Sequence, residues 1–244
     1  MPKLRALVAA AAIFNLLTGA SLAQTVLFSD DFSTYQANTC WTDGATFGQW
    51  TVFWAGLGCV SVISDSTGTW LNETPGSPTG QARSVLTIGP NPRTISPADS
   101  YTYDVSLKTV SQLQKTPRPY QVGWFIWNYS NPNSFYTIVL KTNGWELDKE
   151  YALNGTQTAC FLATGSKDKF PIGVTYHLQV TDSDANGLHT MSVTVSGGSY
   201  NTPKTLTSVT DTGACGGSPY PSGNIALYDE ASSADFTGVQ ISTP

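Results

Sequence analysis

The feature that most constrains the fold is a series of short segments in which apolar and polar residues alternate. These segments cover residues 50–54, 60–64, 84–88, 101–110, 122–129, 135–141, 175–181, 190–196, 225–228 and 236–241. A period of two is typical of half-buried strands, and no stretch keeps a helical period for long. Asn143-Gly144 and Ala185-Asn186-Gly187 indicate hairpins between successive strands. The pattern predicts an antiparallel sandwich or barrel.

The N-terminus has the three parts of a secretory signal peptide. Lys3 and Arg5 supply positive charge, residues 6–17 form an apolar run, and Ser21-Leu22-Ala23 offers small residues to a signal peptidase. The run is shorter than the roughly 20 residues that cross a bilayer. We expect residues 1–23 to be a signal peptide, residues 24–244 to form one domain, and the mature protein to be secreted, extracellular and not in the membrane.

The composition indicates a folded, acidic protein. Charged residues make up only 12% of the chain, whereas aromatic residues make up 11% and include 7 Trp, which argues against disorder. The formal net charge is −5, and no basic patch suited to nucleic acid is evident. We expect a monomer that does not bind nucleic acid.

The four cysteines are an even number in a chain expected to be exported, which favours disulfides. Of the three possible connectivities we favour Cys40–Cys59 with Cys160–Cys215, because Cys40 and Cys59 flank a short segment rich in Gly and Trp. Asn72, Asn128 and Asn154 each begin an N-glycosylation sequon, so a glycoprotein is expected if the host glycosylates.

The order of several short phrases suggests a known fold. Asp30-Asp31-Phe32 lies near the mature N-terminus, Phe170-Pro171-Ile172-Gly173 precedes a strand, and residues 223–228 and Ala234-Asp235-Phe236 follow. The chain resembles the concanavalin A-like jelly-roll superfamily, which includes laminin G-like modules, legume lectins, glycoside hydrolase family 16 and several polysaccharide lyases. The resemblance implies a two-sheet antiparallel jelly-roll β-sandwich with adjacent terminal strands and a glycan-binding face.

The segment from Trp145 to Glu150 is the sharpest chemical signal. In a strand, Glu146, Asp148 and Glu150 point to one face, and a retaining glycosidase needs two carboxyl groups about 5–5.5 Å apart. The segment is similar to the Glu-x-Asp-x-Glu strand of glycoside hydrolase family 16. That resemblance implies Glu146 as nucleophile, Asp148 as its helper and Glu150 as acid/base.

Lys149 departs from that family, in which this position is apolar and faces the core. An unpaired ammonium group is costly to bury. Either the strand ends before Lys149, or the similarity is accidental and the segment is an exposed hairpin arm.

A second reading is a uronan lyase. The order Arg83-Ser84, Gln121-Val122 and then Tyr136 with Lys141 is loosely similar to the motif blocks of alginate lyases, although Gly123 stands where those enzymes carry His. Tyr136 would be the base, with Arg118 and Lys141 as cations and His177 as a possible substitute for the missing His. A third reading is a glycan-binding or adhesion domain without catalysis.

Residues 118–150 combine aromatic rings with planar polar groups, as sugar-binding faces do. The candidate substrate-binding residues are Arg118, Tyr120, Gln121, Trp124, Asn128, Tyr136, Lys141 and Trp145. Any one Trp could instead belong to the core, and Trp124 and Trp127 differ in strand parity.

Asp30, Asp31 and Asp235 lie near the two ends of the chain, and carboxylate oxygens suit Ca²⁺. The resemblance implies a structural calcium there, whereas turn capping is the plainer alternative. We expect no catalytic cofactor. The sequence predicts a secreted protein that acts on a polysaccharide, with hydrolysis favoured over elimination or binding alone.

Overall fold

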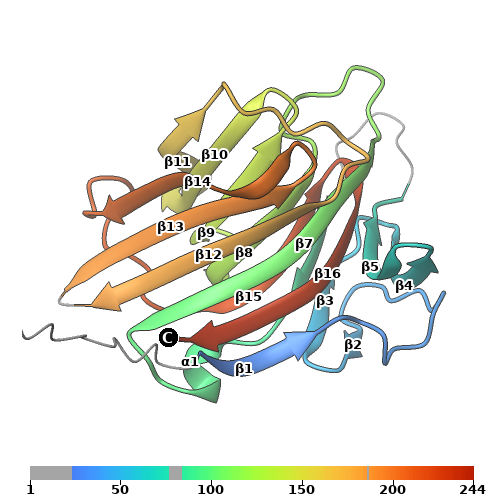
Figure 1. Ribbon diagram of the computed structural model, residues 1–244, viewed down its shortest axis with the longest axis horizontal. Coiled ribbons are helices and arrows are strands. Elements are labelled where there is room, and N and C mark those ends of the chain that lie inside the picture. Colours follow the sequence, from blue (N-terminus) through green and yellow to red (C-terminus); the bar gives the residue numbers. More distant parts are fainter. Residues whose placement is uncertain (1–23, 77–83, 186) are drawn as a thin grey trace, which may run out of the picture.

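The computed structural model describes residues 24–76, 84–185 and 187–244, and the predicted signal peptide therefore lies outside the described residues. The described chain forms two antiparallel sheets packed face to face, with one short helix, α1 (Pro92–Ile95) (Figure 1). The predicted two-sheet antiparallel jelly-roll sandwich is confirmed.

Sheet A has the order β14-β13-β12-β7-β16-β5-β4, with β1 pairing to β16. Its strands are β1 (Thr25–Asp30), β4 (Cys59–Asp65), β5 (Gly68–Thr74), β7 (Ser100–Gln112), β12 (Tyr176–Ala185), β13 (Leu188–Gly197), β14 (Tyr200–Asp211) and β16 (Ser232–Thr243).

Sheet B has the order β11-β10-β9-β8-β15-β6-β3-β2. Its strands are β2 (Thr46–Phe47), β3 (Trp50–Trp54), β6 (Ser84–Ile88), β8 (Gly123–Asn131), β9 (Ser134–Lys141), β10 (Gly144–Leu153), β11 (Thr156–Gly165) and β15 (Asn224–Glu230). In Figure 1, sheet B lies behind the long strands β7, β12 and β13 of sheet A.

The core lies between the sheets and follows from the alternation in each strand. Along β7, Tyr101, Tyr103, Val105 and Leu107 are buried while the residues between them are partly exposed. Phe125, Trp127, Tyr136, Ile138 and Leu147 reach the same core from sheet B. Because burying apolar area stabilises by roughly 25 cal/mol per Å², this alternation holds the two layers together.

Both predicted hairpins are present. The hairpin between β12 and β13 turns through Gly187, whose φ is +73°, and the residue before Gly187 lies outside the described residues. In the hairpin between β9 and β10, Gly144 already pairs with Lys141. The turn residues are therefore Thr142 and Asn143, one position earlier than the Asn-Gly pattern suggested.

The two disulfides join Cys40 to Cys59 and Cys160 to Cys215, which confirms the favoured connectivity. The first joins the segment before β2 to β4. The second joins β11 of sheet B to the segment 212–223 that follows β14 of sheet A. This second disulfide therefore ties the edge strand of sheet B to the segment that connects β14 of sheet A with β15 of sheet B.

Two carboxyl side chains are buried between the sheets, and none of the cations that the structure describes pairs with them. Glu73 of β5 and Asp229 of β15 are fully buried, and both Glu73 oxygens have no hydrogen-bond partner. Burial raises the pKa of Glu73 to about 8. Burial and the neighbouring Glu73 raise the pKa of Asp229 well above its usual value. Both groups are therefore favoured in the neutral, protonated form.

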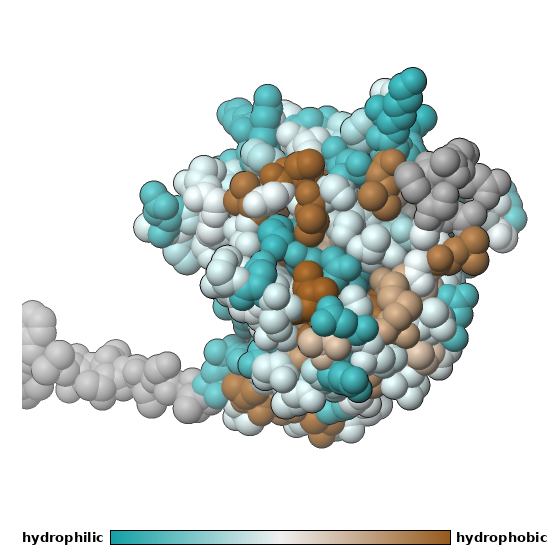
Figure 2. Space-filling view, turned by 90° about the vertical axis from the view of Figure 1, so that its right-hand side faces the viewer, coloured by the Kyte–Doolittle hydropathy of each residue, from teal (hydrophilic) through white to brown (hydrophobic). Residues whose placement is uncertain are grey.

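The outer surface is mixed in polarity on the side that Figure 2 shows, where hydrophobic residues form small patches among hydrophilic and neutral ones. Within the described ranges, no helix has the length and apolar character needed to cross a membrane.

Candidate functional site

Strand β10 presents different chemistry on its two faces. Trp145 and Leu147 pack into the core between the sheets, and alternation places Lys149 on that same face. Glu146, Asp148 and Glu150 lie on the opposite, outer face of sheet B, opposite Val139, Thr137 and Phe135 of β9. The strand continues to Leu153, so Lys149 does not mark its end.

The three carboxyl groups, here called the carboxylate row, are largely buried although they lie outside the sandwich. Burial, followed by the charges of Glu146 and Glu150, raises the pKa of Asp148 to about 8. Burial also raises the pKa of Glu150, and the charge of Glu146 adds to that change. These effects show that the three side chains interact electrostatically.

Each end of the row has a polar partner. Lys141 of β9 forms an ion pair with Glu146. Gln157 of β11 donates a hydrogen bond of 3.1 Å to Glu150. The positive charge of Lys141 therefore lies next to Glu146, whereas the described side-chain partner of Glu150 is neutral.

A pocket of about 200 Å³ lies on the same outer face, and one of its lining residues, Gln157, donates a hydrogen bond to Glu150. It draws residues from β3, β6, β8, β9, β11 and β15, and Trp124 and Tyr228 meet edge to face with ring centroids 4.9 Å apart. The residues that line it are Trp54, Leu86, Trp124, Ile126, Tyr129, Pro132, Phe135, Gln157, Tyr228 and Glu230. We call it the aromatic pocket.

A second hollow of about 370 Å³ adjoins the other end of the row. Lys141, Trp145, Glu146 and Phe161 are among the residues that line it. Phe161 of β11 pairs with Asp148 and is 59% exposed. Apolar surface is therefore available on both sides of the carboxylate row.

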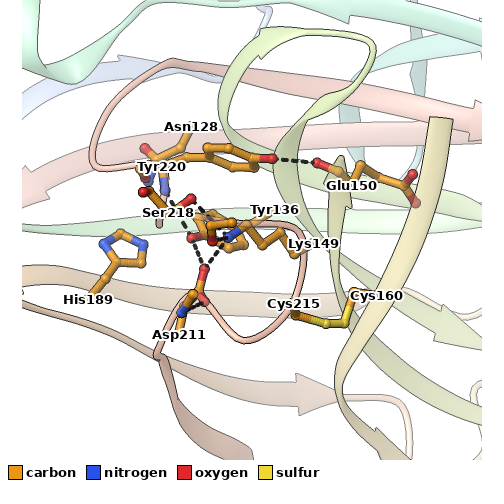
Figure 3. Close-up of polar contacts among 12 residues, drawn as sticks. Asn128, Tyr136, Lys149, Glu150, Cys160, His189, Asp211, Cys215, Ser218 and Tyr220 are labelled. Carbon is orange, nitrogen blue, oxygen red and sulfur yellow. Dashed lines mark hydrogen bonds and ion pairs between the residues drawn. A yellow bond between two sulfur atoms is a disulfide. The ribbon is translucent and has the colours of Figure 1, made fainter. Parts of the chain in front are cut away.

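The inner face of β10 holds a buried polar cluster (Figure 3). The Lys149 ammonium lies 2.7 Å from Asp211, and both side chains are almost fully buried. Lys149 also donates to the carbonyls of Gly217 and Ser218. Burial raises the pKa of Asp211, but hydrogen bonds from Lys149 and Tyr136 outweigh it, so the net pKa lies below the usual value. The unpaired charge that the sequence left open is thus compensated.

The same cluster fixes segment 212–223 against β10. Tyr220 donates its backbone NH to the Tyr136 hydroxyl at 3.0 Å, and its own hydroxyl to the Glu150 backbone carbonyl at 3.1 Å. In Figure 3 the Glu150 carboxyl points away from the cluster. With the disulfide from Cys160 to Cys215, these contacts hold β10 from behind, where they set the position of the carboxylate row.

Two candidate residues point into the sandwich instead of toward the row. Tyr136 donates its hydroxyl to Asp211 at 2.6 Å, and burial with this bond raises its pKa far above the usual value. Asn128 has φ +52° at a register shift, and its amide donates to Asp182 and to the Tyr220 carbonyl. The bulge turns Asn128 inward, against the simple parity that grouped it with Trp124.

Other candidate residues lie apart from the row. His177 lies on the other sheet, with Nε2 3.2 Å from Asp104. Gln121 is buried and accepts a hydrogen bond from the Arg118 backbone NH. Tyr120 contributes its carbonyl to the Trp124 indole NH at 3.0 Å.

Trp145 packs mainly into the core. Trp124 faces the aromatic pocket and Trp127 the core, as their opposite parity requires. Arg83 lies outside the described residues.

The structure does not bring the three candidate calcium ligands together. Asp30 accepts hydrogen bonds from Tyr35 and Trp50, whereas Asp31 caps the turn at Ser33. Asp235 forms an ion pair of 2.8 Å with Lys108. Across the described ranges, no group of three or more His, Cys, Asp or Glu side chains is arranged to hold a metal ion.

Several residues of the outer face were not among the candidates that the sequence indicated. Trp54, Tyr129, Phe135, Gln157, Phe161, Tyr228 and Glu230 come from five different strands. Only the strand order of sheet B brings them together, and alternation alone does not reveal that order.

The sequence matches no family model, and the curated proteins gave no match either. Solved structures do match. Peanut lectin aligns over 91% of this chain and 98% of its own at 11% identity, with a TM-score of 0.52. The fold is the concanavalin A-like jelly roll. Winged bean acidic lectin, in complex with methyl-α-D-galactose, aligns over 90% of this chain and 98% of its own at 11% identity, with a TM-score of 0.51. An endo-β-1,4-glucuronan lyase from the fungus Trichoderma reesei covers 90% of this chain and 96% of its own at 11% identity, with a TM-score of 0.48. At such identities the likeness concerns the fold alone.

Proposed function

We propose that this protein is a secreted glycoside hydrolase that cleaves within a polysaccharide chain at the carboxylate row. The observation that carries the proposal is the placement of Glu146, Asp148 and Glu150 side by side on one outer sheet face. Apolar surface adjoins both ends of the row. A chain bound across such a face would extend past the carboxyl groups in both directions, as internal cleavage requires.

The electrostatics favour different roles for the two glutamates. A general acid must keep its proton near the working pH, and the raised pKa of Glu150 suits that role. A nucleophile must be ionised, and Glu146 is the carboxyl group of the row that forms an ion pair, with Lys141. Asp148, whose pKa is about 8, would keep its proton and use it to donate a hydrogen bond to the Glu146 carboxylate.

In this mechanism Glu146 attacks the anomeric carbon while Glu150 protonates the leaving oxygen. Water, deprotonated by Glu150, then releases the sugar from Glu146. Lys141 must move away from Glu146 when the substrate binds, because its ammonium group is paired with the carboxylate that has to attack.

Recognition without cleavage is the second candidate. It is favoured by the low exposure of the row, since Glu146, Asp148 and Glu150 are 7%, 2% and 5% exposed. Lectins of this fold include one solved in complex with galactose. Elimination has less support, because Tyr136 points to the opposite side of sheet B from Lys141 and Glu146.

The test is a polysaccharide panel assayed for new reducing ends, absorbance at 235 nm and binding. Hydrolysis produces new reducing ends without absorbance at 235 nm, and elimination produces new reducing ends together with that absorbance. A protein that only binds produces neither reducing ends nor absorbance. Glu146→Gln and Glu150→Gln should each lower turnover by at least about a hundredfold, since acid–base catalysis typically contributes that much or more. Asp65→Asn, which removes a carboxyl group from the loop end of β4 in sheet A, should leave turnover unchanged. Near-normal turnover in either glutamine variant would refute the assignment.

A further inference from the structure

The aromatic pocket has a composition that the proposed chemistry does not explain. Its walls are mostly aromatic, with Trp54, Trp124, Phe135 and Tyr228 among them. Among the described residues that line it, Glu230 is the one acidic residue and none is basic. A pocket meant for a uronate would need Arg or Lys to pair with the ligand carboxylate.

The carboxyl group of Glu230 is held in place from two sides. Tyr228, which itself lines the pocket, donates its hydroxyl to Glu230. Ser84 of the neighbouring strand β6 donates to the same oxygen at 3.2 Å. Both donors are neutral, so no described cation compensates the charge of an ionised Glu230 within these contacts.

A second, independent observation is an unused polar group. Tyr129 is 95% buried, it lines the pocket, and its hydroxyl has no hydrogen-bond partner. Burial raises its pKa to about 12, so the hydroxyl keeps its proton. A buried polar atom without a partner is costly. A bound ligand that supplies a hydrogen-bonding group would satisfy it.

Aromatic faces that surround a negative charge are the arrangement that recognises organic ammonium groups. A cation is attracted by the electron-rich faces of the rings and by the carboxylate together. A neutral amide or hydroxyl in the same place would lose most of this attraction.

We propose that the aromatic pocket binds an ammonium group, and that in the proposed function this group is the amine of an amino-sugar residue in a cationic polysaccharide. The link to a polysaccharide rests on the proposed function, because the pocket adjoins Glu150 through Phe135 and Gln157. Recognition of the ammonium group itself does not depend on cleavage.

The acidity of the site is consistent with this ligand class. The outer face of sheet B carries the acidic residues Glu146, Asp148, Glu150 and Glu230. Among the described strand residues of that face Lys141 is the one cation, and it is already paired with Glu146. The chain as a whole has a formal charge of −5. A cationic polymer would be attracted to this face, whereas an acidic one would be repelled.

The experiment compares a glucosamine tetramer, its N-acetylated counterpart and a glucose tetramer by titration of tryptophan fluorescence at pH 6. Trp54 and Trp124 in the pocket provide the signal. The glucosamine tetramer should bind at least about tenfold more tightly than both neutral tetramers. Equal affinity for all three would overturn the proposal. This comparison uses only the natural protein, so it does not depend on any variant folding.

Glu230→Gln should remove the preference for the amine, and Asp65→Asn, which changes an exposed carboxyl group at the end of β4, should retain it. A preference that survives in Glu230→Gln would contradict the role of the carboxylate. Choline is titrated in parallel. If it binds as tightly as the glucosamine tetramer, the site holds an ammonium group that need not come from a glycan, which supports the pocket and rejects the amino-sugar.

Turnover is measured separately on the same polymers. Tight amine binding without new reducing ends would leave the ammonium site intact while the hydrolase proposal fails. Hydrolysis of a neutral glucan with no preference for amines would support the hydrolase proposal and refute the ammonium site.

Discussion

Replacing Glu73 by Gln should remove a large dependence of stability on pH. The pKa of Glu73 rises from 4.5 in the unfolded chain to about 8 in the folded protein, because burial between the sheets penalises the charged form. At about 1.4 kcal/mol per pKa unit, this change corresponds to roughly 5 kcal/mol. The contribution is fully present below pH 4.5 and is lost as the pH rises toward 8. A typical domain is stable by only about 5–15 kcal/mol, so the effect is measurable.

The assay is urea unfolding of the natural protein and of Glu73→Gln at several values between pH 5 and pH 9. Glutamine resembles the protonated acid, so the two proteins should have similar free energies of unfolding near pH 5, and the variant should become the more stable one at pH 9. Asp65→Asn is the matched control. The Thr67 hydroxyl and backbone NH lower the pKa of Asp65 to about 2, so its contribution changes only at acid pH. A constant difference between the natural protein and Glu73→Gln from pH 5 to pH 9 would refute the reasoning.

Three further predictions concern the buried ion pair, the two disulfides and the glycosylation sequons. Lys149→Met should lower the unfolding free energy by about 3–5 kcal/mol, because it leaves Asp211 buried without its cation. The double variant Lys149→Met with Asp211→Leu should recover much of that loss in the same urea assay. Replacing Cys160 and Cys215 by Ser should lower the unfolding free energy by about 4 kcal/mol, because the two cysteines are 55 residues apart. Replacing Cys40 and Cys59, which are 19 residues apart, should lower it by about 3 kcal/mol. Equal losses of stability in thermal melts would count against the explanation by chain entropy. In a glycosylating host, mass spectrometry should find a glycan at Asn154 and none at Asn128, because Asn154 lies exposed in a turn whereas the Asn128 amide is buried and bonded to Asp182.

The strands that sequence patterns predict best are those with one face in the core. Residues 50–54 and 84–88 match β3 and β6 over their full lengths. Strand β14 is largely exposed along its length and lies at the edge of sheet A, and only Tyr200, Leu206 and Val209 of it pack, partly buried, against the core, so its alternation is weak. Strand β11 is the corresponding edge of sheet B and escaped notice for the same reason. Alternation signals half-burial, and an exposed edge strand lacks it.

The placement of the carboxylate row could be predicted because it depends on alternation within one strand. The partner of Lys149 could not, because Asp211 lies in the other sheet, far along the chain. Asn128 was misplaced for a different reason: a bulge reverses the side on which its side chain emerges, and a periodic pattern contains no signal for one extra residue. The aromatic pocket needs the order of six strands, which only long-range pairing determines.

The pairing of β1 with β16 has a mechanical consequence. Thr25 lies opposite Thr243, and Asp30 lies opposite Val239, so the outer ends of both strands meet at one corner of sheet A. A force that pulls these two ends apart is directed perpendicular to the strands and parallel to the hydrogen bonds between them. It opens these hydrogen bonds one pair at a time, beginning at Thr25. Anchoring the protein by both of these strand ends would load its weakest direction. An attachment at a single end leaves this ladder unloaded.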